Sequence, residues 1–160
     1  MLLFLFSTIA RAEPFYITIP GEGWSLKVDA PPMTSVKGTS EGRIYQYMAS
    51  SVETGLTLSL HTETEGGRSN QECRETYWRL AQRNPTLVKD TVTLSGSEQA
   101  LFATHLSEGV YKGEAFKTAN GHAYLAKNGL CIDLHASHWP YDVSSEKRVE
   151  EILRSVTIVQ

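Results

Sequence analysis

Apolar and polar residues alternate along most of this chain, which is the pattern of strands that bury one face. Alternating runs on either side of a glycine-containing turn at 21–23 predict a first hairpin from residues 15–19 and 24–28. Polar residues 37–42 break the alternation, and we interpret them as a loop. The same pattern predicts further strands at 43–50, 56–61, 86–94, 100–108 and 156–159.

The strongest local signal lies in residues 114–138, where two alternating runs meet at Asn128-Gly129. A two-residue type I′ turn needs positive φ at both positions, which Asn and Gly tolerate best, so a long β-hairpin is expected. Gly121 interrupts the first of these strands, and we expect a β-bulge there, although a further turn is the alternative.

Two segments follow a helical period instead, with apolar residues three or four positions apart. The first covers residues 69–84, where Ser69 and Glu72 fit a capping box and Pro85 ends the helix. Its expected inward side chains are Cys73, Tyr77, Leu80 and Ala81. The second covers residues 144–154, with expected inward side chains Val149, Ile152, Leu153 and Val156.

These elements predict an α+β fold. Short links make the strands mostly antiparallel, in a sheet of seven or more strands. One apolar stripe on each helix indicates that both helices pack on the sheet, as in an α/β/α sandwich. A length of 160 residues suits one domain. The net charge of −3 gives no basic field, so a nucleic-acid partner is not expected.

The N-terminus differs from the rest of the chain. Leu2 to Phe6 is a short apolar run, and Ala10-Arg11-Ala12 fits the small-x-small rule for signal peptidase. We therefore predict a signal peptide over residues 1–12 and a domain over 13–160, in the periplasm or outside the cell. A buried first strand or a short anchor is the alternative. The basic residues that usually precede such a run are missing, which leaves open whether Met1 is the true start. No later run is long enough for a membrane span.

The chain has two cysteines, Cys73 and Cys131. An even cysteine count in an exported protein favours a disulfide between them. Two separate buried thiols are the alternative, because sequence does not show whether the Cβ atoms meet.

Asp133, His135 and His138 form the one cluster of chemically active side chains, and they suggest a metal site or a hydrolytic centre. On a strand, however, positions i and i+3 point to opposite faces, so His138 should be separated from the other two. The competing interpretation pairs Asp133 with His135 in a polar layer under a helix. His61, His105 and His122 lie on other strands, and their placement is open. No complete catalytic or cofactor motif occurs, so no cofactor is expected.

Trp139 and Tyr141 flank Pro140 in the loop after the central hairpin. If they are exposed they predict a protein-binding hot spot, because Trp and Tyr dominate interface energetics. The alternative is that they close the end of the core.

Three segments carry a resemblance to a known group: GWSLKVDAP at 23–31, YLAKNGLCIDLHAS at 124–137 and SSEKRVEEILRSVTI at 144–158. Their order and layout resemble the PsbP/Mog1-like α/β/α sandwich group. That group includes photosystem accessory proteins, a Ran-binding protein and bacterial envelope proteins. The resemblance implies a non-catalytic binding or accessory role and carries over no catalytic residue.

The functional expectation is a non-catalytic exported binding protein whose partner is another envelope or secreted protein. The alternative is a small metal-dependent or hydrolytic enzyme centred on Asp133, His135 and His138. The sequence names no ligand, no specific partner and no oligomeric state.

Overall fold

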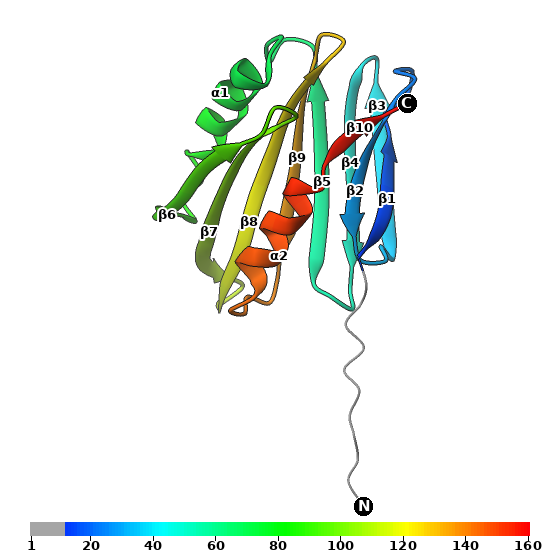
Figure 1. Cartoon of the computed structure of the whole chain (residues 1–160). Coiled ribbons are helices and arrows are strands. Elements are labelled where there is room, and N and C mark those ends of the chain that lie inside the picture. Colours follow the sequence, from blue (N-terminus) through cyan, green and yellow to red (C-terminus); the bar gives the residue numbers. More distant parts are fainter. Residues whose placement is uncertain (1–11) are drawn as a thin grey trace, which may run out of the picture.

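Ten strands and two helices make up a computed structural model that describes residues 12–160 (Figure 1). The seven-stranded sheet has the order β3-β4-β5-β9-β8-β7-β6 with antiparallel neighbours. Its strands are β3 (Ser35–Glu41), β4 (Ile44–Ser51), β5 (Leu56–Glu63), β6 (Leu87–Gly96), β7 (Leu101–Tyr111), β8 (Glu114–Lys127) and β9 (Leu130–His138). The three-stranded sheet has the order β1-β2-β10 and consists of β1 (Glu13–Thr18), β2 (Ser25–Ala30) and β10 (Thr157–Val159). The predicted α+β fold is confirmed.

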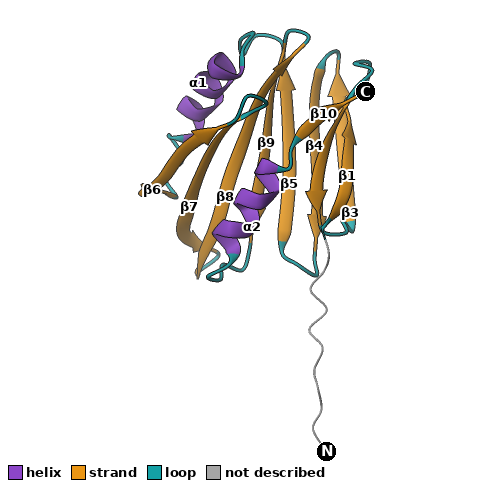
Figure 2. Cartoon of the chain, viewed as in Figure 1, coloured by secondary structure: helices purple, strands orange, loops and turns teal. Residues whose placement is uncertain are grey.

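The two helices, α1 (Asn70–Ala81) and α2 (Ser145–Arg154), lie on opposite faces of the larger sheet (Figure 2). Both contact β7, β8 and β9, and α2 also contacts β2. The smaller sheet shares the face of α2, where Phe15 of β1 packs against Tyr47 of β4. This side holds the main core, whose largest fully buried side chains include Leu58, Leu125 and Ile132. One face of the larger sheet is therefore covered by α2 and the smaller sheet, and the other face, within residues 12–160, is covered only where α1 lies.

The central hairpin forms as predicted. Lys127 pairs with Leu130, and Asn128 and Gly129 have φ values of 52° and 75°. Positive φ at both positions is the type I′ pattern, whose twist matches that of the flanking strands.

Gly121 does not mark a bulge, so that prediction is wrong. The register of β8 with β7 and with β9 continues unbroken through Gly121. A Cβ atom there would lie 2.5 Å from Leu153 Cδ1 and 2.7 Å from Val149 Cγ1. The glycine is needed because α2 packs directly on the backbone of β8.

Residues 37–42 are not a loop, because β3 runs from Ser35 to Glu41. All seven residues of β3 are exposed. The sequence pattern missed this strand because neither of its faces is buried, so no apolar alternation marks it.

Helix α1 has the predicted capping box, in which the Ser69 side chain accepts from the backbone of Glu72 and Glu72 bonds back to Ser69. Its inward face differs from the prediction, because Leu80 is 54% exposed and Trp78 is buried. Tyr77 and Trp78 pack together against the sheet instead.

Cys73 of α1 and Cys131 of β9 are bonded, with an S–S distance of 1.93 Å and a Cα–Cα distance of 5.4 Å. The bond attaches the first turn of α1 to the sheet. Within residues 12–160, no helix is both long enough and apolar enough to cross a membrane.

Candidate functional site

Four of the five histidines lie on the face of the larger sheet that α1 partly covers, and we call it the histidine face. The pairing of β9 with its neighbours sets them side by side. His122 of β8 lies opposite His135, and His61 of β5 lies opposite Asp133. His105 of β7 lies one strand further, opposite Asn120.

The histidines that meet here come from four different strands, and one turn predicts the central pairing. A two-residue turn at Asn128-Gly129 places residues equidistant from it opposite each other, which pairs His122 with His135. This register was available in the sequence. The positions of His61 and His105 were not, because they depend on the order of strands in the sheet.

Asp133 is paired with His122, not with His135, which corrects the predicted partnership within β9. His122 Nδ1 donates to Asp133 Oδ1 at 2.9 Å, and the two side chains are only 12% and 16% exposed. Tyr124 lies directly opposite Asp133, and His122 is the diagonal neighbour on β8, whose imidazole ring is long enough to reach the carboxylate.

His135 is held in its neutral form. Its Nε2 lies 3.2 Å from Asn120 Oδ1, and its Nδ1 lies 3.4 Å from the Ser59 hydroxyl. Because the amide oxygen only accepts, Nε2 carries the proton and Nδ1 accepts from Ser59. Burial, and then the neighbouring His122, lowers the pKa of His135 to about 3.

Three imidazole rings stack along the histidine face. The ring centroids of His122 and His135 are 4.5 Å apart, and those of His122 and His105 are 5.8 Å apart. Trp78 of α1 lies against this stack, 5.7 Å from the His105 ring. Burial lowers the pKa of His105 as well. The stacked rings offer flat apolar surface together with hydrogen-bonding edges.

Two phenols complete the part of the histidine face that α1 covers. The rings of Tyr77 and Tyr124 are stacked with centroids 6.3 Å apart. Their hydroxyls are buried and have no hydrogen-bond partner among residues 12–160. Burial, and then the negative charges of Glu63 and Asp133 on Tyr77 and of Asp133 on Tyr124, raises the pKa of both phenols. Both hydroxyls therefore stay protonated and are poor nucleophiles.

The structure does not bring His138 together with Asp133 and His135. His138 lies on the α2 face, where Nδ1 is 2.9 Å from the Ser145 hydroxyl and Nε2 is 3.0 Å from the Arg148 guanidinium. Burial and the charge of Arg148 lower its pKa. Across residues 12–160, the His, Cys, Asp and Glu side chains form no group of three or more that could hold a metal ion.

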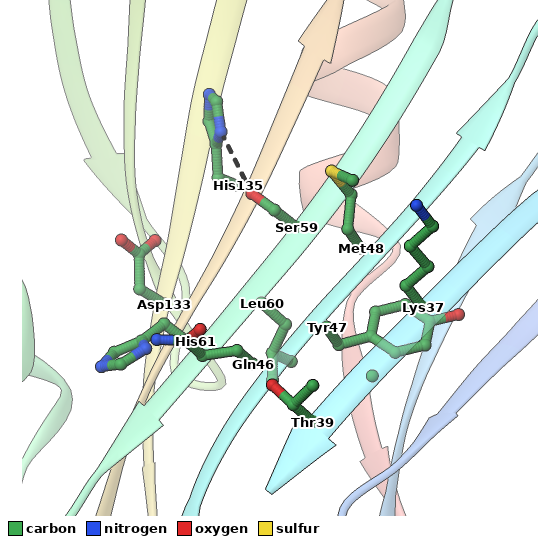
Figure 3. A pocket seen from close by; sticks show the side chains of 11 residues that line it. Lys37, Thr39, Gln46, Tyr47, Met48, Ser59, Leu60, His61, Asp133 and His135 are labelled. Atoms are coloured by element: carbon green, nitrogen blue, oxygen red, sulfur yellow. Dashed lines mark hydrogen bonds between the residues drawn. The ribbon is translucent and has the colours of Figure 1, made fainter.

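A hollow of about 430 Å³ lies on the histidine face beside the part that α1 covers (Figure 3). It is formed by β3, β4, β5 and β9 and is open to solvent. Asp133 and His135 form one wall, with His61 and Ser59 beside them on β5 (Figure 3). The other lining residues are Lys37, Gly38, Thr39, Gln46, Tyr47, Met48 and Leu60. Met48 is 48% exposed, which places an apolar side chain among the polar ones.

Trp139 and Tyr141 lie away from this hollow, in the loop between β9 and α2. Trp139 is 59% exposed, as a binding hot spot requires. Tyr141 is partly buried, donates to Glu146 at 2.7 Å and lies under the Lys117 ammonium. The two aromatic side chains therefore sit in different surroundings, and only Trp139 offers a large free surface.

Comparison with known proteins adds little. No family model matches the chain, and no curated protein matches it. A crystal structure from Bacteroides thetaiotaomicron VPI-5482 is similar with a TM-score of 0.46 and 9% identity, covering 84% of this chain and 45% of that chain. The chain thus spans less than half of that protein's length. A similarity this low carries no information on function.

Proposed function

We propose that this protein is a non-catalytic binding protein of an exported compartment, and that it holds a segment of a partner protein in the hollow of the histidine face. The observation that carries the proposal is the uneven cover of the larger sheet. Among residues 12–160, the smaller sheet and α2 cover one face, whereas α1 packs on β7, β8 and β9 of the other, reaches β5 only through the Tyr77–His61 contact and leaves β3 and β4 uncovered. The hollow lies on this uncovered part of the sheet, and a concave surface with a few polar groups is a typical binding site.

The chemistry of the hollow supports binding over catalysis. His135 is neutral and the His122–Asp133 pair has no activated nucleophile beside it, because the nearby phenols stay protonated. Such groups recognise a ligand through hydrogen bonds and ring stacking. An open hollow lined by the apolar Met48 and the charged Lys37 suits an extended peptide segment better than an enclosed small molecule.

Two further expectations fit this proposal and belong to it. The Cys73–Cys131 disulfide is compatible with an oxidising compartment such as the periplasm or the cell exterior. The resemblance to the PsbP/Mog1-like group implies accessory proteins that act through protein contacts. The partner we propose is accordingly another envelope or secreted protein.

Site-directed photo-crosslinking tests the proposal. A benzophenone amino acid replaces Met48 in one variant and Val110, which is 71% exposed and far along β7, in a matched control. We expect a discrete cross-linked partner from position 48 and none from position 110. Adding Gln46→Trp, which fills the hollow from β4, should remove the product. Equal products from both positions, or a product that survives Gln46→Trp, would contradict the proposal.

A further inference from the structure

The edge strand β3 is unusual because none of its residues is buried. All seven of its residues are exposed, although a strand normally gains its stability from one buried face. Its pairing with β4 is regular from Ser35 to Glu41, with no bulge. No strand among residues 12–160 pairs with its outer backbone groups, which therefore form a regular edge that is a template for another strand.

The opposite edge of the same sheet is protected. The register of β6 with β7 breaks between Val88 and Thr93, and Thr91 fills the break by donating to Val88 and accepting from Leu106. A bulge of this kind twists an edge away from further pairing. The two edges of one sheet thus differ, and only β3 keeps the geometry that an added strand needs.

The sequence of β3 is complementary to itself. Lys37 and Glu41 lie two positions on either side of Thr39, and all three share the histidine face because they alternate along the strand. Neither charge has an ion-pair partner within residues 12–160. If two copies of β3 pair antiparallel about Thr39, each Lys37 faces the Glu41 of the other copy.

Other antiparallel registers lose this match. Centring the pair on Lys37 would set two ammonium groups opposite each other, which destabilises a cross-strand pair. Centring it on Gly38 would place Lys37 opposite Thr39 and leave every charge unmatched. Only the register about Thr39 satisfies both charges of both strands.

We infer that the protein forms a two-fold homodimer in which two β3 strands pair antiparallel about Thr39. The dimer joins two seven-stranded sheets into one and makes the two histidine faces continuous. Figure 1 draws β1, the outer strand of the smaller sheet, on the same border of the molecule as β3, so this strand can add contacts. The interface is small compared with the roughly 1,000 Å² of a stable complex, and we expect a dissociation constant in the micromolar range. The inference is independent of the proposed partner protein.

Charge exchange tests both the dimer and its register. Sedimentation equilibrium should give a dimer for the full chain without its predicted signal peptide. Lys37→Glu alone sets two carboxylates opposite each other, and Glu41→Lys alone sets two ammonium groups opposite each other. Each should weaken the dimer by about tenfold or more, since two symmetric pairs change from attraction to repulsion. The double exchange Lys37→Glu with Glu41→Lys restores opposite charges and should restore the wild-type dissociation constant.

Lys112→Glu is the matched control, because Lys112 carries the same charge at the exposed turn between β7 and β8. It should leave the dissociation constant unchanged. Circular dichroism checks that each variant is folded. A wild-type chain that stays monomeric at millimolar concentration would overturn the inference. So would single variants that dimerise like wild type, or a double exchange that remains as weak as the single variants. None of these outcomes affects the cross-linking test at Met48.

Discussion

The neutral state of His135 makes the stability of this protein depend on pH. Burial lowers its pKa from the ordinary 6.5 to about 3 in the folded protein. The unfolded chain restores the ordinary value and therefore binds more protons between these two pH values. Stability consequently falls as the pH drops from about 6.5 to about 3, and this contribution stops changing below the lower value.

The magnitude follows from the distance between the test pH and the ordinary pKa. About pH 5 lies some 1.5 units below that pKa, and each unit is worth about 1.4 kcal/mol. The neutral His135 should therefore lower the free energy of unfolding by about 2 kcal/mol at this pH, relative to neutral pH. His135→Gln removes the titrating group and keeps an amide that can donate to Asn120 and accept from Ser59. Over the same pH step, the free energy of unfolding of this variant should fall by about 2 kcal/mol less than that of the wild type.

Urea unfolding followed by tryptophan fluorescence at neutral pH and at about pH 5 measures this difference. His61→Gln is the control, because it makes the same substitution on the same face at a side chain that is 36% exposed. It should follow the wild-type pH dependence. Parallel losses in wild type and His135→Gln would refute the reasoning, since the burial of His135 would then not be the source.

Two further predictions concern the helices. Reducing the Cys73–Cys131 bond releases a loop of 58 residues and should lower the free energy of unfolding by about 4 kcal/mol in the chain-entropy model. Urea unfolding with and without reductant measures this loss, and an unchanged midpoint would contradict the account. Gly121→Ala pushes a methyl group against Leu153 and Val149 of α2 and should lower the free energy of unfolding by about 1–3 kcal/mol. The loss should appear as a lower thermal midpoint, and a midpoint equal to that of the wild type would show that α2 moves to make room for the methyl group.

The local features of the fold were predictable from the sequence. The hairpin at Asn128-Gly129 and the capping box at Ser69 depend on a few adjacent residues whose backbone preferences are strong. Strand β3 was not predictable, because a strand exposed on both faces has no apolar period. The role of Gly121 was missed for a different reason. The sequence does not distinguish a strand glycine that lets a helix pack close to the backbone from one that forms a bulge.

The candidate site was predictable only in part. Alternation along β9 correctly placed Asp133 and His135 on one face, and His138 on the other. The partners of these residues come from other strands, and choosing them requires the register and the order of the strands. The turn at Asn128-Gly129 fixes the register of β8 with β9, and therefore the position of His122. The position of Ser59 beside His135 follows from the contact of β5 with β9, which no local pattern contains.

The two helices are held on the sheet by different means, and the difference explains how the histidine face is kept. Helix α2 packs on apolar residues such as Leu125 and Leu134, so hydrophobic burial is its main source of stability. Helix α1 lies on histidine rings and on the phenol of Tyr124, a surface that gives less hydrophobic stabilisation. The disulfide to Cys131 supplies what the packing lacks. A chain under selection for stability alone would replace these polar groups by apolar ones. Their presence beside an open hollow, with a covalent bond to offset the cost, is what the proposed binding role would require.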